Sequence, residues 1–182
     1  PAILSKTLIS LWSTNMKKWG LFFFCAIFLL ACKKEEKFSN TPAIEFVSLT
    51  KIDNGTQIDQ RATLVLHFQD GDGDIGLNST DITPPFDTSS VYYYNFFIDY
   101  YKKVNGEFEK IEFEEISFNQ RIPRLSETLP ESIEGDISLN LDINSYDLST
   151  TYDTIRFQCY IVDRELNHSN IVTTPELVVK KK

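Results

Sequence analysis

The stretch Ala62-Thr63-Leu64-Val65-Leu66-His67-Phe68 indicates the fold class of this chain. Its even-numbered positions are apolar, whereas Thr63 and His67 are polar. Successive side chains of a β-strand point to opposite faces, so this period of two predicts a strand with one buried face. The acidic, glycine-rich run Gln69-Asp70-Gly71-Asp72-Gly73-Asp74-Ile75-Gly76-Leu77 follows at once and predicts a loop after that strand.

Two further apolar rows repeat the same alternation, while helical periodicity is nearly absent. They comprise Ile137, Leu139, Leu141 and Ile143, and then Ile155, Phe157, Cys159 and Ile161. Because Cys159 stands within such a row, we expect it to be a small core residue rather than a nucleophile.

A β-hairpin is predicted around Asn105-Gly106, because a type I′ turn needs positive φ at both central positions. This turn would pair Val104 with Glu107. The apolar row that leads into it would then lie on one face of the hairpin; it comprises Tyr92, Tyr94, Phe96, Ile98 and Tyr100.

The whole set of segments predicts an all-β domain over residues 43–182. Residues 44–49 and 171–179 bring the number of expected strands to about seven. Seven short antiparallel strands at this length favour a single immunoglobulin-like or fibronectin-type β-sandwich. A small barrel or a jelly roll is the alternative architecture.

The N-terminal part of the chain has the layout of a secretory signal. Met16, Lys17 and Lys18 precede an apolar run over residues 21–31, which is too short to span a bilayer. The run ends in Leu29-Leu30-Ala31-Cys32, which resembles the lipobox of bacterial lipoprotein precursors. The resemblance implies a signal helix at 16–31, cleavage before Cys32 and a lipid on that cysteine, with residues 1–15 as upstream translation. The alternatives are a plain signal peptide and a buried hydrophobic helix.

Residues 32–42 are expected to form the lipidated cysteine and a tether. The run Lys33-Lys34-Glu35-Glu36-Lys37 is similar to the charged export tag of Bacteroidetes surface lipoproteins. That similarity implies an outer-membrane location, with exposure at the cell surface. The simpler interpretation is a solvated linker, because a mixed charge run without apolar residues cannot pack.

Charge excludes one class of partner. The segment before Cys32 holds three of the eighteen basic residues and no acidic one, so the 151 residues from Cys32 onward carry fifteen basic and twenty-six acidic side chains, a net charge of −11. Nucleic-acid binding depends on neutralising phosphates, so we expect no nucleic-acid partner.

Asp70, Asp72 and Asp74 alternate with glycines, which lets a tight loop direct several hard oxygens at one calcium ion. The spacing resembles the opening of an EF-hand loop, with Asp81 at its twelfth position, but Ile75 replaces the required glycine and strands flank the loop. A true EF-hand is therefore rejected. The phrase is more similar to the Asp-Gly-rich loops of bacterial immunoglobulin-like and cadherin-like modules. The alternative is an acidic turn that binds nothing.

A second loop, Asp163-Arg164-Glu165-Leu166-Asn167-His168-Ser169-Asn170, joins the last two expected strands. It is similar to a turn at the same place in bacterial immunoglobulin-like domains. In such a sandwich the loops after the second and sixth strands emerge at one end, so we expect Asp163 and Asn167 to complete the metal site.

The hairpin also offers a candidate ligand surface, formed by Tyr93, Phe97 and Tyr101 opposite the core row. Exposed aromatic rings can stack on a glycan or on another envelope protein. Alternatively, the segment from Glu114 to Ser132 covers this face. No nucleophile motif is present, so we expect a non-catalytic binding or scaffolding domain; a hydrolase that uses paired carboxylates is the competing class.

Overall fold

The computed structural model describes residues 38–114, 116–125, 131–144 and 150–182, and these belong to one compact unit. The predicted signal helix, the lipidation site Cys32 and most of the tether lie outside the described residues. Within the described residues there is no α-helix, and no helix is long and apolar enough to cross a membrane. The domain is all-β, as the sequence predicts.

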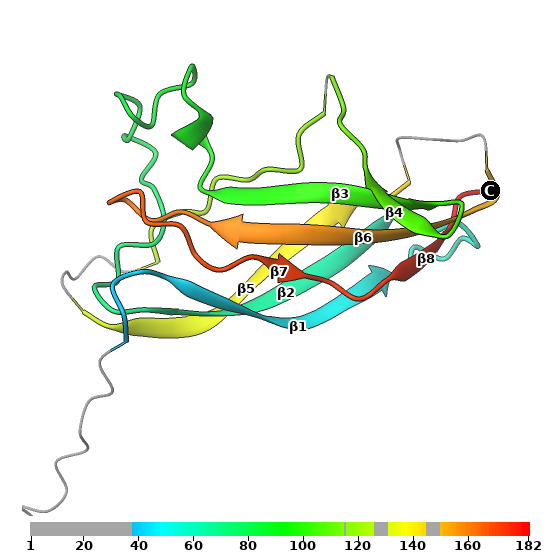
Figure 1. Ribbon diagram of the computed structural model, residues 1–182, viewed down its shortest axis with the longest axis horizontal. Coiled ribbons are helices and arrows are strands. Elements are labelled where there is room, and N and C mark those ends of the chain that lie inside the picture. Colours follow the sequence, from blue (N-terminus) through cyan, green and yellow to red (C-terminus); the bar gives the residue numbers. More distant parts are fainter. Residues whose placement is uncertain (1–37, 115, 126–130, 145–149) are drawn as a thin grey trace, which may run out of the picture. The chain divides into compact units, whose positions relative to one another are not determined.

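Two antiparallel sheets face each other (Figure 1). The first sheet has the order β1-β2-β5 and consists of Ala43–Ile52, Arg61–Asp70 and Ile133–Asp142. The second has the order β4-β3-β6-β7, with β8 also paired to β6; its strands are β3 Phe96–Val104, β4 Glu107–Lys110, β6 Tyr152–Ile161, β7 Val172–Thr173 and β8 Leu177–Lys180. The first, second and fifth strands thus face the third, sixth and last, which is the immunoglobulin-like arrangement.

The three predicted apolar rows form the core between the sheets. In β2 the even-numbered side chains from Ala62 to Phe68 are all buried. In β6, Ile155, Phe157, Cys159 and Ile161 are each fully buried. Burial also raises the pKa of the Cys159 thiol to about 12, so this cysteine is a core residue, as predicted.

The hairpin register is confirmed, with Val104 opposite Glu107 and positive φ at Asn105 and Gly106. The predicted strand over residues 92–100 is wrong at its start, because residues Val91–Tyr93 form a 3-10 turn, η1. Ser90 caps this turn, since its side chain accepts a hydrogen bond from the backbone N–H of Tyr92.

The last predicted strand, 171–179, is divided into β7 and β8 by Pro175. Proline has no backbone N–H and cannot continue the ladder. The neighbouring Thr174 compensates, because its hydroxyl accepts a hydrogen bond from the N–H of Phe157 at 3.0 Å and its own N–H donates to the Phe157 carbonyl at 2.9 Å.

Residues 116–125, the longest described part of the segment from 114 to 132, do not cover the outer face of the second sheet. Gln120 instead pairs with Phe96 and extends the edge of β3. Phe118 enters the core, where its ring stacks on Tyr100 with the centroids 5.5 Å apart. The aromatic ring of Phe118 finds more apolar neighbours between the sheets than outside them.

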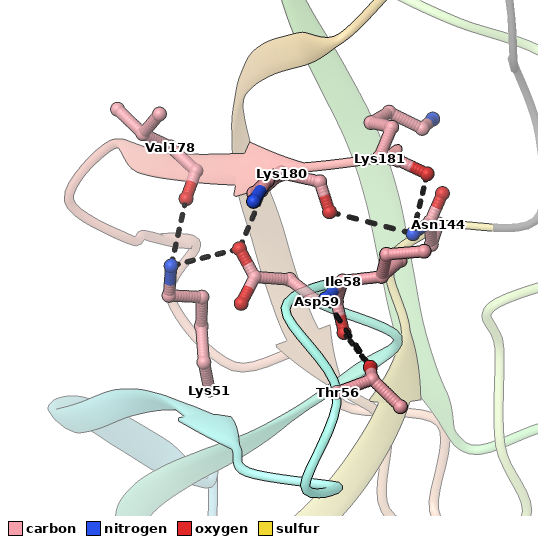
Figure 2. Close-up of polar contacts among 8 residues, drawn as sticks. All are labelled: Lys51, Thr56, Ile58, Asp59, Asn144, Val178, Lys180 and Lys181. Carbon is pink, nitrogen blue, oxygen red and sulfur yellow. Dashed lines mark hydrogen bonds and ion pairs between the residues drawn. The ribbon is translucent and has the colours of Figure 1, made fainter.

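At the end of the sandwich where β2 begins, polar contacts tie the connection after β1 to the last strand (Figure 2). Asp59 Oδ2 accepts hydrogen bonds from Lys51 Nζ and from the N–H of Lys180, both at 2.8 Å. Lys51 Nζ also donates to the Val178 carbonyl at 3.3 Å, and the Asn144 amide nitrogen is 3.5 Å from the Lys180 carbonyl. These contacts hold the two sheets together at this end.

Candidate metal centre

The opposite end of the sandwich, where β2 finishes, carries the predicted metal motif. Side chains at even positions of β2 face the core, and Asp70 is the last of them. The strand therefore directs the Asp70 carboxylate into the end of the sandwich, where it is completely buried. Asp74, four residues later, is 7% exposed. Burying ionised carboxylates without a partner is costly, so their surroundings need explanation.

Two glycines of the loop are fixed by backbone geometry. Gly73 and Gly76 have φ of 68° and 99°, which other residues rarely adopt. A Cβ at Gly73 would lie 2.3 Å from the Glu131 carbonyl oxygen, and one at Gly76 would lie 2.2 Å from the Pro123 carbonyl oxygen. The loop is thus packed against two other backbone segments. Its glycines allow that close approach as well as the tight turn.

The three loop carboxylates converge on a single point. One oxygen from each of Asp70, Asp72 and Asp74 lies within 4.8 Å of the other two. The Oδ1 atom of each residue is buried and has no hydrogen-bond partner. Asp70 uses its other oxygen, Oδ2, to accept a hydrogen bond from the Ile75 N–H at 3.3 Å. Each of the three carboxylates therefore has a buried oxygen without a partner, and the group is compact enough to surround one cation.

Burial and mutual repulsion raise the pKa values of two of these carboxylates. Burial, followed by repulsion from Asp72, raises the pKa of Asp70 to about 6. Burial, followed by repulsion from Asp163, raises the pKa of Asp74 to about 7. Both effects disfavour the ionised form. A cation among these oxygens would remove the repulsion, and hard carboxylate oxygens are the ligands that Ca²⁺ and Mg²⁺ prefer. The buried group Asp70, Asp72 and Asp74 could therefore hold a metal ion.

The second predicted loop lies at the same end, beside the first (Figure 1). Asp163 follows β6, is 2% exposed, and its charge contributes to the raised pKa values of Asp70 and Asp74. The amide nitrogen of Asn167 is directed at Asp163 and not at the three loop carboxylates. Its backbone N–H and its Nδ2 donate to the two oxygens of Asp163, at 2.8 Å and 2.9 Å. Asn167 therefore orients Asp163, whose carboxylate borders the cluster.

Asp81, at the twelfth position of the EF-hand spacing, is engaged elsewhere. Its carboxylate forms an ion pair with Arg164 and accepts a hydrogen bond from the Asn78 N–H at 2.7 Å. The bond from the Arg164 guanidinium lowers the pKa of Asp81. The rejection of an EF-hand agrees with this geometry. Arg164 follows β6, so the ion pair also fastens the two acidic loops to each other.

Arg121 is a second clamp that the sequence did not single out. Its guanidinium donates to three backbone carbonyls of the long connection after β2, those of Tyr93 at 2.7 Å, Asn78 at 3.1 Å and Asp81 at 2.7 Å. The available signal was that Arg121 and Arg164 are basic residues of an acidic chain. Only the fold shows which loop each arginine holds.

The predicted aromatic surface is not an exposed patch. Phe97 is 7% exposed, because its ring stacks on Tyr160 at a centroid distance of 4.8 Å. Tyr101 is half-buried and donates its hydroxyl hydrogen to Gln158 Oε1 at 2.9 Å. Tyr93 is also half-buried and ends η1. Phe97 is therefore not available as an exposed ring, and a ligand-binding role for the three residues stays a prediction.

Comparisons with known proteins add little to this description. No protein-family model matches the chain, and no curated protein matches it. Among solved structures it is similar to the X-ray structure of Northeast Structural Genomics Consortium target SoR45, at 8% identity over 79% of this chain and 89% of that one. The TM-score is 0.24, so this similarity carries no argument.

Proposed function

We propose that this chain is an exported bacterial lipoprotein, anchored in the outer membrane by lipid on Cys32 and exposed at the cell surface. Its sandwich is a non-catalytic binding or scaffolding domain that a structural calcium ion stabilises. The lipobox-like sequence before Cys32 supports the anchor. The ligand is a glycan or another envelope protein, and Tyr93, Phe97 and Tyr101 are the candidate contact residues.

One observation carries the calcium proposal, namely the three buried oxygens of Asp70, Asp72 and Asp74 that have no hydrogen-bond partner. A buried polar atom without a partner costs about 1–3 kcal/mol, and more when it is charged. Since one oxygen of each carboxylate also lies within 4.8 Å of the others, a cation bound by all three residues explains the cluster. Asp163, with Asn167 orienting it, supplies the next carboxylate, and the loop can add backbone oxygens to complete the six to eight ligands that calcium takes.

Isothermal titration of calcium into the mature protein tests this site. We expect one ion per chain, and we expect Asp72→Asn to remove most of the heat because it deletes one of the three converging carboxylates. Asp136→Asn is the matched control, since Asp136 is an acidic residue of β5 with 59% of its side chain exposed and it pairs only with His67 in the described residues. If the wild-type protein gives no heat at millimolar calcium, the proposed site is wrong.

The competing proposal is an envelope hydrolase that uses two carboxylates. One location for it among the described residues is a hollow of about 270 Å³ beside β3 and β4, which is lined by Asp99 and Glu112. Lys110 lies within 3.0 Å of the Asp99 carboxylate and 3.7 Å of the Glu112 carboxylate, so the two acids share a cation instead of facing a substrate alone. This geometry favours the non-catalytic function. Hydrolysis of glycosides by the purified protein, lost in Asp99→Asn, would instead establish the enzyme.

A further inference from the structure

The chain that leads into β1 touches the metal loop through its backbone. The Gly71 N–H donates to the Ser39 carbonyl at 2.8 Å. A Cβ at Gly71 would lie 2.3 Å from the Phe38 carbonyl oxygen, so only glycine permits this approach. Gly71 stands between Asp70 and Asp72, two of the converging carboxylates. The first described residues of the chain are thus docked on the candidate metal centre itself.

The second acidic loop holds the same part of the chain. The Asn170 side chain donates to the Ile44 carbonyl at 2.8 Å and accepts a hydrogen bond from the Ile44 N–H at 2.9 Å. The Asn170 amide thus satisfies both backbone groups of Ile44, as a neighbouring strand would, at the beginning of β1. Residues 38–44 are therefore attached to both loops of the metal centre, at Gly71 and at Asn170. We call residues 38–44 the stem.

We propose that cation binding at the Asp70, Asp72 and Asp74 group latches the stem onto the domain, and that loss of the cation releases it. The inference rests on the proposed calcium site. With the ion bound, the three carboxylates are drawn together and the Gly71 N–H is held in place for Ser39. Without the ion the carboxylates repel one another, the loop relaxes, and the stem loses the fixed donor that orients it.

The stem connects the metal end of the sandwich to the proposed lipid anchor by a short stretch of chain. Seven residues lead from Cys32 to Ser39. At about 3.3–3.6 Å per extended residue, they span at most about 25 Å. A lipid on Cys32 therefore keeps the latched end near the bilayer surface, while the Asn105-Gly106 hairpin turn lies at the far end of β3. Calcium thus controls how rigidly the domain stands on its anchor.

Hydrogen–deuterium exchange of the mature lipidated protein in detergent micelles tests the latch. Deuterium uptake is measured by mass spectrometry in peptides that cover residues 38–44 and Gly71, with calcium and with a chelator. We expect exchange of the Ile44 amide, the stem N–H that donates to Asn170, to be at least about fivefold slower with calcium, the protection that one hydrogen bond supplies. Peptides from the centre of β3 and β6 serve as the internal reference.

Gly71→Ala is the variant that separates the latch from the ion, because it keeps every carboxylate and inserts a Cβ against Phe38. We expect its stem to exchange rapidly with and without calcium. Exchange of the wild-type stem with calcium and with chelator is the decisive comparison. If calorimetry shows calcium binding but stem exchange in the wild type is unchanged by calcium, the latch is wrong and the calcium site stands. If calorimetry shows no binding, both the calcium site and the latch are wrong.

Discussion

Replacing Asp74 by asparagine should change stability in opposite directions with and without calcium. In the metal-free protein at pH 8, Asp74 is ionised although burial and its acidic neighbours raise its pKa from 3.8 to about 7. Because the folded-state pKa is raised, the proton-linked stability is fully present below about pH 4 and is lost as the pH rises to about 7. The difference between 3.8 and about 7 corresponds to about 4 kcal/mol.

The amide in Asp74→Asn has no charge and can donate hydrogen bonds to the carboxylates of Asp70 and Asp72. Burying an amide still costs about 1–3 kcal/mol, so we expect a net gain of about 2 kcal/mol in the metal-free variant. In a domain of this size that gain raises Tm by about 6 °C. In calcium the order reverses, because an ion at one hundred times its Kd stabilises the wild type by about 2.7 kcal/mol and the variant has lost a ligand.

Thermal unfolding at pH 8, followed by circular dichroism in chelator and in millimolar calcium, measures both differences. Repeating the chelator series at pH 4 provides the control, since the wild-type carboxylate is then protonated and the advantage of Asp74→Asn should disappear. The reasoning is refuted if Asp74→Asn lowers Tm equally with and without calcium. In that case the carboxylate would be satisfied within the protein and would not await a cation.

Three further predictions concern the rest of the domain. Gly76→Ala should destabilise the domain by more than about 3 kcal/mol in urea unfolding, since its Cβ would meet the Pro123 carbonyl oxygen at 2.2 Å. Gly55→Ala is the control, because Gly55 also has a positive φ but has open space around it, and it should cost only about 1–2 kcal/mol. Asp153→Asn should cost about 3–5 kcal/mol at pH 7, because it removes the charge of a buried carboxylate that forms ion pairs with Lys102 at 2.9 Å and with the buried Lys181 at 3.2 Å. The pKa of Asp153 is lowered, so its contribution is present above pH 3.8, and the difference from wild type should vanish as the pH falls below that value. Cys159 should resist thiol reagents at pH 8 in the folded protein and react once urea unfolds it, because its pKa is about 12 and it is buried; labelling of the native protein would contradict this.

Local sequence accounts for most of the strands and, within the site, for the loop that carries Asp70, Asp72 and Asp74. The row from Ala62 to Phe68 predicted the buried face of β2, and the acidic run after it predicted the loop, although β2 continues through Asp70. Asn105-Gly106 predicted the hairpin register, because few residues accept positive φ at two successive positions. The strand prediction failed at one place, where the alternation of apolar residues competed with a local capping residue. The row from Tyr92 continued the alternation, yet a 3-10 turn capped by Ser90 formed there.

The site itself depends on residues that are distant in sequence. Asp81, which the spacing placed beside the cluster, pairs with Arg164, 83 positions later. No periodicity reports such contacts, since they depend on how two loops from different sheets meet. The lipid anchor at Cys32 and the location of the protein remain predictions from the sequence.

The sequence by itself determined the all-β class, the buried faces of β2, β5 and β6, and the alternation of carboxylates after β2, because these follow from the two-residue period of a strand and from local turn chemistry. Only the tertiary structure decided that Asp70 and Asp74 are buried beside the half-buried Asp72, that the charge of Asp163 acts on them, and that the Gly71 N–H donates to the stem. Burial and charge repulsion are properties of the assembled end of the sandwich, where separate loops exclude solvent together, and no single segment of the chain contains them.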